Sequence, residues 1–151
     1  MVEQHDFKEF PELTKRQLNE FRFDSPHVQI EEDFDANVVK VHDGDTIRLT
    51  TSFRDFDFPL RFLGIDAPEM NAGGREARDW LRGKILGQDV KILVDVDNRV
   101  DKYGRLLGRV FYAGMDVGDE EMRMGLALPF NRRREGELPN LDKMFSLKQW
   151  L

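Results

Sequence analysis

Apolar and polar residues alternate along much of the chain in the pattern of short, half-buried strands. Residues 89–96 show it most plainly, because every second residue from 90 to 96 is Val or Ile. The Asp43-Gly44 pair between two apolar runs is typical of a tight hairpin, with Asp45 at its exit. The expected strands are residues 37–41, 46–50, 58–65, 89–96 and 106–112.

Gly64 interrupts the third of these strands. In a regular strand Arg61 and Asp66 would face opposite sides, because they are five residues apart. Glycine inside a strand often marks a bulge or a bend. We therefore predict a break at Gly64 that turns Arg61 and Asp66 toward one site, and a regular ladder through Gly64 would contradict this.

Helical periodicity is present at three further places. Residues 76–86 carry apolar side chains at helical spacing and are followed by Gly87, which suits a C-terminal cap. Residues 116–124 begin at Asp116, a good N-cap. Residues 140–151 begin at Asn140 and predict a short helix docked on the domain. Strands and helices together predict an α+β fold.

Residues 1–36 precede the first strand as an acidic N-terminal extension. Thr14 and Gln17 have the spacing of a capping box, which predicts a short helix. A disordered tail rarely carries as many aromatic side chains as this segment does, at Phe7, Phe10, Phe21 and Phe23. We expect the extension to dock on the rest of the chain or to mediate self-association. The sequence thus divides into residues 1–36 and a domain of residues 37–151.

The composition sets broad limits. A chain of 151 residues is long enough for one domain with a hydrophobic core. It contains no cysteine, which excludes disulfides and thiolate metal sites. The first residues lack the basic start and apolar run of a signal peptide, and no segment approaches membrane-spanning length. We therefore expect a cytoplasmic protein.

The net charge of −6 is concentrated in the extension. Residues 1–36 hold four basic and ten acidic residues, while the other 19 basic and 19 acidic residues cancel. A neutral domain is expected to bind a polyanion weakly. One face could still be locally positive, and the alternative is scattered solubilising charge. The residues concerned are Arg99, Lys102, Arg105 and the run 132–134.

Three short clusters carry the candidate chemistry: His42-Asp43-Gly44-Asp45-Thr46, Arg61-Phe62-Leu63-Gly64-Ile65-Asp66-Ala67-Pro68-Glu69 and Asp101-Lys102-Tyr103-Gly104-Arg105. They offer three carboxylates suited to a cation and two guanidiniums. Hard divalent cations prefer oxygen ligands, and the planar arginine side chain matches a phosphate. This is the minimum set for metal-assisted phosphodiester cleavage. Each motif alone has a simpler interpretation as a hairpin turn or a loop.

In order, identity and approximate spacing, the clusters resemble those of the staphylococcal (thermonuclease-like) nucleases, over residues 37 to 151. The resemblance implies a five-stranded β-barrel of the OB type with about three helices. It also implies one bound calcium ion, with magnesium and manganese as alternatives. The implied ligands are the Asp45 and Asp66 carboxylates and the main-chain carbonyl of Ala67.

The same resemblance implies the roles of three more side chains and a reaction. Glu69 would orient or deprotonate the attacking water, while Arg61 and Arg105 would hold the phosphate and stabilise its developing charge. The reaction would be calcium-dependent hydrolysis of single-stranded or frayed DNA and RNA by in-line attack of water. It would leave 3′-phosphate ends.

Two other classes of function are compatible with the sequence. One is a non-catalytic module that binds nucleic acid or protein on the same fold, although the presence of all five side chains weighs against it. The other is a structural or interaction role in which the acidic extension is the working part. Stabilisation by calcium would separate the enzyme from both, because a ligand that binds only the native state stabilises it.

Two positions depart from the family's usual pattern. Glu121 stands in helix 116–124 where the family usually has an aliphatic core residue. We expect either a rotated helix or an exposed Glu121, with the packing supplied by Met122, Met124 and Leu126. The family's two base-flanking tyrosines are also missing, and Phe130 lies in the corresponding stretch. We expect Phe130 in the core, with a stacking surface for a base as the alternative.

Overall fold

A computed structural model describes residues 5–21 and 24–130 of the chain. The strands are β1 (Phe34–Asp43), β2 (Thr46–Thr51), β3 (Arg54–Phe62), β4 (Ile65–Asp66), β5 (Asp89–Leu93), β6 (Leu106–Tyr112), β7 (Met115–Asp116) and β8 (Leu128–Pro129). The helices are α1 (Lys15–Phe21), α2 (Arg75–Ile85) and α3 (Val117–Arg123), with shorter turns η1 (Met70–Gly74) and η2 (Val96–Asn98). Within these described ranges, no helix has the length and apolar character needed to cross a membrane.

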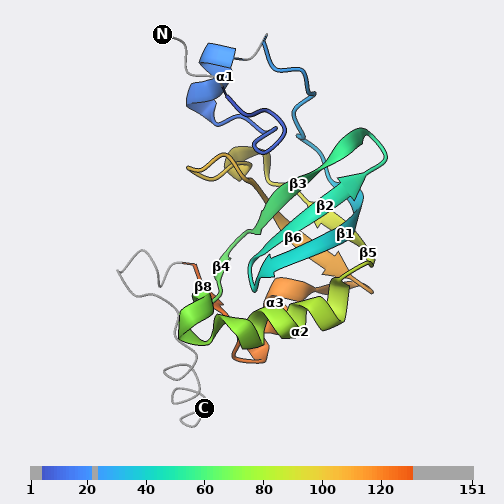
Figure 1. The fold of residues 1–151 in the computed structure, drawn as a ribbon, viewed down its shortest axis with the longest axis vertical. Coiled ribbons are helices and arrows are strands. Elements are labelled where there is room, and N and C mark those ends of the chain that lie inside the picture. Colours follow the sequence, from blue (N-terminus) through green and yellow to red (C-terminus); the bar gives the residue numbers. More distant parts are fainter. Residues whose placement is uncertain (1–4, 22–23, 131–151) are drawn as a thin grey trace.

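Five strands close into a barrel (Figure 1). They follow the order β3-β2-β1-β5-β6, and β6 pairs with β3 in parallel to complete the ring. The other neighbouring pairs in the ring are antiparallel. The short strands β4 and β8 pair with each other outside the ring. This confirms the predicted α+β fold, with its five-stranded barrel and helices.

Buried aliphatic and aromatic side chains fill the barrel. The register of β1 is irregular between Val38 and Lys40, and residues 39 and 40 are both exposed. The next inward-facing residue after Val38 is therefore Val41. Helix α2 lies across one end of the barrel and adds Leu81 and Ile85 to the same core. The fully buried strand residues include Val38, Ile47, Leu49, Phe58, Leu60, Ile92 and Val110.

The elements are found where they were predicted, but three strands differ in their bounds by more than one residue: β1 is longer than the expected 37–41, and β3 runs from Arg54 to Phe62 instead of over 58–65. Helices α2 and α3 differ from the expected ranges by one residue at each end, and β6 has the expected bounds. The strand predicted over residues 89–96 ends at Leu93 instead. The Asp95 side chain accepts a hydrogen bond from the Asp97 main-chain N–H at 3.0 Å, which begins the turn η2. The predicted helix 140–151 and the basic run 132–134 lie outside the described residues.

The N-terminal segment packs against the end of the barrel opposite α2 (Figure 1). Its capping box is confirmed, because the Gln17 N–H donates to Thr14 Oγ1 at 3.2 Å and the Thr14 N–H donates to Gln17 Oε1 at 3.1 Å. Glu12 and Leu13 are almost fully buried in this contact. Docking on the barrel, one of the two expected arrangements, is therefore present. The division of the chain at residue 36 stays a prediction.

The seam where β3 meets β6 generates a stability prediction. Gly108 lies opposite Phe62 there, and a Cβ added at Gly108 would come within 2.7 Å of Ile92 Cγ2 and 3.1 Å of Leu60 Cδ1. We expect Gly108→Ala to lower the free energy of unfolding by about 1–3 kcal/mol, because a fully buried core must shift to accept the methyl group. Urea unfolding measures the loss.

Gly83→Ala is the matched control. Gly83 lies in α2, and no atom lies within 4 Å of a Cβ added there. This substitution should stabilise the protein by about 0.5–1 kcal/mol through helix propensity. Equal effects of the two substitutions would show that the seam does not require glycine.

Candidate active site

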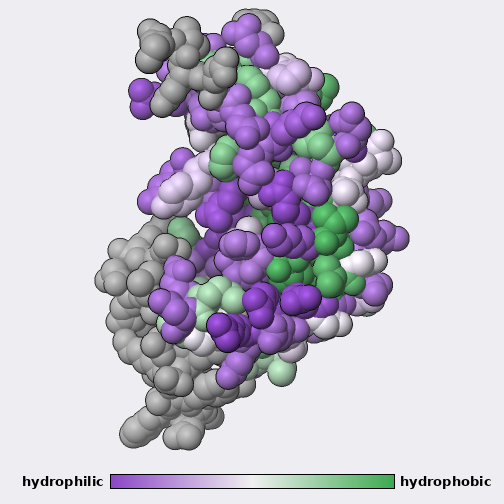
Figure 2. Space-filling view, in the orientation of Figure 1, coloured by the Kyte–Doolittle hydropathy of each residue, from purple (hydrophilic) through white to green (hydrophobic). Residues whose placement is uncertain are grey.

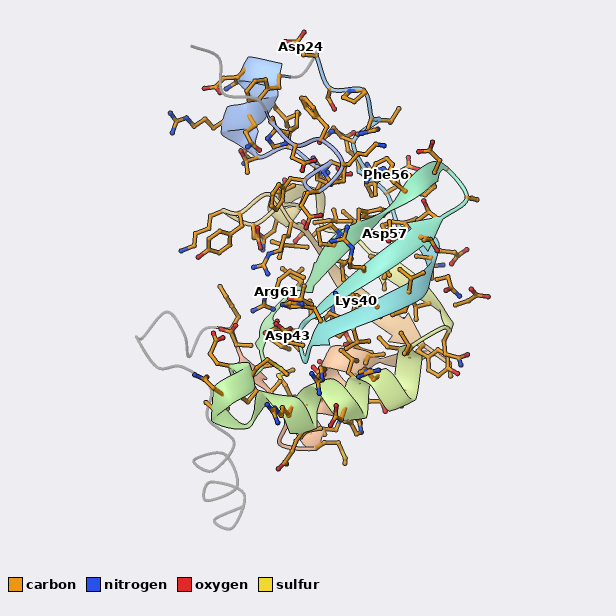
Figure 3. The ribbon with its side chains drawn as sticks, viewed as in Figure 1. Asp24, Lys40, Asp43, Phe56, Asp57 and Arg61 are labelled. Carbon is orange, nitrogen blue, oxygen red and sulfur yellow. The ribbon has the colours of Figure 1, made fainter. Side chains whose placement is uncertain are left out.

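A cluster of three buried charged residues lies near the α2 end of the barrel. Asp45 comes from the β1–β2 turn, Arg61 from β3 and Asp66 from β4. The Arg61 guanidinium donates a short hydrogen bond from Nη2 to Asp66 Oδ1, and the same Nη2 lies 3.3 Å from Asp45 Oδ2. All three residues are at most 7% exposed. In Figure 3 the labelled Arg61 lies beside Asp43, which precedes the Asp45 turn.

The break at Gly64 brings Arg61 and Asp66 together. Strand β3 ends at Phe62 and β4 begins at Ile65, and Gly64 between them has φ of 85°, a left-handed conformation that favours glycine. Arg61 Nη1 donates to the main-chain oxygens of Phe62 at 2.9 Å and Ile65 at 2.8 Å, so the guanidinium holds both sides of the turn. The predicted break in the strand is confirmed.

Asp45 is held by the main chain of the next loop. Its Oδ2 accepts a hydrogen bond from the Ala67 N–H at 2.8 Å, and its Oδ1 accepts one from Thr46 Oγ1 at 3.1 Å. Burial raises the pKa of Asp45 to about 6, against the opposing effect of the Arg61 charge. The neighbouring Asp43 contributes to this raised pKa. Asp45 therefore lies in a site that is short of positive charge.

These donors fit a hard divalent cation. Two buried carboxylates share one guanidinium, which leaves the three side chains with a net negative charge when all are ionised. Oxygen ligands and excess negative charge are what calcium and magnesium require. In the described part of the chain, no group of three or more His, Cys, Asp or Glu side chains is arranged to hold a metal. A cation here would need main-chain and water oxygens besides Asp45 and Asp66, and Ala67 directly follows Asp66.

Glu69 lies three residues beyond Asp66, at the start of η1. Its main-chain oxygen accepts hydrogen bonds from the N–H groups of Ala72 at 2.8 Å and Gly74 at 2.9 Å, which fix the position of its backbone. The residue is exposed. The loop that carries Asp66 and Ala67 into the cluster thus presents Glu69 at the surface beside it.

Arg105 stands apart from the cluster. Its Nε donates to Asp101 Oδ2 at 2.7 Å, and its guanidinium carbon lies 5.3 Å from the centre of the Tyr103 ring. Leu106, the next residue, pairs with Leu60, the residue before Arg61. The main chain therefore places Arg105 directly before β6, the strand that pairs with β3, and the side chain of Arg105 binds Asp101.

Glu121 is buried, which contradicts the second of the two expected alternatives, an exposed side chain. It is 0% exposed, and neither carboxylate oxygen has a hydrogen-bond partner among the described residues. Burial raises its pKa well above the usual value, and the negative charges of Asp45 and Asp43 raise it further. Glu121 lies four residues after the buried Val117, and this helical spacing was the sequence signal that it faces inward.

Two further expectations are wrong. Phe130 is 38% exposed and is not part of the core, because it follows the short edge strand β8 and its N–H donates to the Gly64 oxygen at 3.0 Å. Arg99 is buried, with 8% exposed, and forms an ion pair with Glu12 at 2.9 Å. Arg99 therefore adds no charge to an exposed positive face.

Comparison with known proteins gives one family. The model of the family described as staphylococcal nuclease homologue matches residues 59–149. A probable endonuclease LCL3 of Leptosphaeria maculans is 33% identical over 97 residues, covering 57% of this chain and 32% of that protein. An uncharacterized endonuclease of Escherichia coli O157:H7 is 35% identical over 97 residues, covering 63% of this chain and 60% of that protein.

A longer match is to an uncharacterized protein of Bacillus anthracis, which is 28% identical over 134 residues, or 84% of this chain and 57% of that protein. The chain thus spans between 32% and 60% of the length of these three relatives. The matches to the fungal and E. coli proteins cover about the same number of residues as the family model does.

The buried Glu121 generates a pH-dependent stability prediction. Its folded-state pKa is raised, so its contribution to stability is complete below the unfolded value of 4.5 and is lost as pH rises toward the folded value. We expect Glu121→Leu to stabilise the protein at pH 7 by about 1–3 kcal/mol, because it removes a buried carboxyl without hydrogen bonds. The gain should grow with pH above 4.5.

Urea unfolding at pH 5, 6, 7 and 8 in chelator measures this difference. Glu120→Leu is the control, because Glu120 is the preceding residue of α3 and forms an ion pair with Lys84 at 2.8 Å. The control should bring no gain. A Glu121→Leu protein that is less stable than wild type at pH 8 would contradict the prediction.

Proposed function

The chain belongs to the staphylococcal nuclease homologue family, and we propose that it is a calcium-dependent nuclease that hydrolyses phosphodiester bonds of DNA and RNA. The observation that carries the proposal is the buried cluster of Asp45, Arg61 and Asp66. Burying two carboxylates with a single guanidinium is costly, since desolvation costs several kcal/mol per ion and the three side chains keep a net negative charge. A bound divalent cation would offset this excess negative charge.

Asp45, Asp66 and the Ala67 carbonyl would hold the cation. When bound, it would supply Lewis-acid polarisation of a phosphate oxygen and a site for water. A second positive charge beside Asp45 would favour its ionised form and offset the effect of burial on its pKa, which is about 6 without the cation. Calcium is the ion that the family resemblance implies, and magnesium and manganese share its preference for oxygen ligands.

Glu69 is the proposed base or orienting group for water. It is exposed, and its backbone is fixed next to the loop that carries Asp66 and Ala67. An accessible carboxylate can accept a hydrogen bond from a water and align it for in-line attack on phosphorus. Asp45 and Asp66 are unsuited to this task because both are buried against Arg61.

The two arginines are proposed to bind the phosphate. Arg61 lies inside the cluster, where a fixed guanidinium can stabilise charge that develops on the phosphorus in the transition state. Arg105 lies in the loop directly before β6 and is partly exposed, with Asp101 limiting its movement. We propose that Arg105 reaches the phosphate when substrate binds and also stabilises the departing oxygen.

The substrate and product follow from the family resemblance. Single-stranded or frayed DNA and RNA are the proposed substrates, with cleavage that leaves 3′-phosphate ends. Phe130, which is 38% exposed, is the proposed surface on which a base stacks, and stacking tolerates any base. A weak, non-selective affinity agrees with the balanced charge of residues 37–151.

Cleavage of a labelled single-stranded oligonucleotide tests the proposal. Wild-type protein should cut in calcium and not in chelator. Arg61→Ala and Glu69→Ala should each lower the rate roughly 100-fold to 1000-fold, because each removes a group that acts in the transition state. Arg109→Ala is the control, since Arg109 is half exposed and paired with Asp116. Wild-type turnover by folded Arg61→Ala or Glu69→Ala would refute the assigned roles.

Calcium binding can be tested without turnover. Calcium at 100 times its dissociation constant should raise the free energy of unfolding of wild type by about 2.7 kcal/mol, which raises the thermal unfolding temperature. The Asp45→Ala, Asp66→Ala double variant should lose this response, whereas Asp79→Ala, which changes an exposed carboxylate of α2, should keep it. A folded wild type that neither responds to calcium nor cuts would instead be a non-catalytic binding module.

A further inference from the structure

Glu12 of the N-terminal extension is inserted between two arginines of the barrel. Its Oε1 accepts a short hydrogen bond from Arg54 Nη2, and its Oε2 accepts one from Arg99 Nη1 at 2.9 Å. The Ile30 N–H also donates to Oε2, at 2.8 Å. The carboxylate is fully buried, and the Arg54 and Arg99 side chains are 4% and 8% exposed. This network joins the extension to β3 and to the segment before β6.

Arg99 links this network to the loop that carries Arg105. Arg99 is the last residue before the loop that ends at Arg105, and its main-chain oxygen accepts a hydrogen bond from the Leu107 N–H at 2.7 Å. Within the loop, the Asp101 N–H donates to the Arg105 oxygen at 3.0 Å. Glu12 therefore fixes the base of the loop that presents Arg105.

Phe10 supports the same loop at its tip. Gly104 is buried, and a Cβ added there would lie 3.4 Å from Phe10 Cβ and 3.5 Å from Phe10 Cδ1. The phenylalanine is therefore in close contact with the residue before Arg105. His5 Nε2 lies 2.8 Å from the Phe10 main-chain oxygen, within hydrogen-bonding distance, and holds Phe10 in place.

The segment between Phe10 and Leu13 is itself rigidly placed. Gln29 accepts a hydrogen bond from the Leu13 N–H at 2.6 Å and donates to the Pro11 oxygen at 2.9 Å. Leu13 is 1% exposed. In Figure 1 this segment lies above the loop before β6, and Figure 2 shows hydrophilic and hydrophobic residues mixed on this part of the surface.

We propose that Glu12 and Phe10 are positioning residues for Arg105: the extension holds the loop of residues 99–105 so that its arginine can meet the phosphate. The proposal rests on the role proposed above for Arg105 in phosphate binding. The extension thereby becomes part of the machinery of the site, although it touches none of Asp45, Arg61 or Asp66 through any hydrogen bond or ion pair of the described residues. Two of its acidic residues, Glu9 and Glu12, form ion pairs with arginines outside the extension.

The test compares Phe10→Ala and Glu12→Gln with the control Glu9→Gln. Glu9 belongs to the same extension, but its ion pair is with Arg48 of β2, at 3.1 Å and partly exposed, so its loss leaves the loop untouched. The kcat and KM for a single-stranded oligonucleotide are measured in saturating calcium, at a temperature where each variant is folded. Each substitution is made in wild type and in Arg105→Ala.

If the proposal is right, Phe10→Ala and Glu12→Gln lower kcat roughly 10-fold to 100-fold in wild type, because a misplaced group loses its effect on the reaction. In the Arg105→Ala background the same substitutions should change kcat less than about twofold, since no arginine remains to be positioned. Glu9→Gln should match wild type. An equal loss in both backgrounds, or full activity of folded Phe10→Ala, would overturn the proposal. Phe10→Ala carries the test if Glu12→Gln fails to fold.

Amide hydrogen exchange separates this proposal from the proposed nuclease activity. The N–H groups of Asp101, Gly104 and Arg105 are hydrogen-bonded within the loop. Their exchange should be faster in Phe10→Ala than in wild type and unchanged in Glu9→Gln. If wild type cuts nothing, the proposed function fails, and unchanged exchange in Phe10→Ala would overturn the positioning role as well. Faster exchange would then support the contact between the extension and the loop on its own.

Discussion

The Arg61 guanidinium faces two carboxylates in a space that admits almost no water, and the α2 end of the barrel is built around this contact. Arg61 also binds the main-chain oxygens on both sides of the Gly64 turn, so one side chain sets the path of the chain from β3 to β4. Asp45 ties the β1–β2 turn to the same place through the Ala67 N–H. Removing one partner of such a buried network typically costs about 3–5 kcal/mol, because the remaining charge stays buried.

The same cluster has two carboxylates for one guanidinium, and this excess negative charge favours the binding of a cation. Burial and Asp43 raise the pKa of Asp45 to about 6, and the charges of Asp45 and Asp43 add to the effect of burial on the pKa of Glu121. The raised pKa values mean that the ionised carboxylates are destabilised in this site, and a bound cation would stabilise them. A structural ion pair that is balanced within the protein would not need such a cation. The membership of the chain in the staphylococcal nuclease homologue family agrees with this interpretation.

A second buried network closes the opposite end of the barrel, where Glu12 binds Arg54 and Arg99. Both networks place arginines of the barrel beside carboxylates, but only the first has more carboxylates than arginines. The second has one carboxylate for two guanidiniums, so it leaves no negative charge in excess, and it holds the extension on the barrel. Because Arg99 leads into the loop that carries Arg105, this network fixes the start of that loop.

The sequence by itself predicted most of the helices and strands and the candidate residues of the site, because these predictions depend on local patterns. Four features depend only on residues close together in the sequence: the period of the strands, the Asp43-Gly44 turn, the Thr14–Gln17 cap and the break at Gly64. Only the tertiary structure decided which side chains are buried and what they meet. Arg99 and Glu121 carry charges that favour the surface, yet Glu12, 87 residues before Arg99, supplies a buried partner, and helix packing draws Glu121 inward. Contacts between distant segments are fixed by the packing of the whole barrel, which no local pattern encodes.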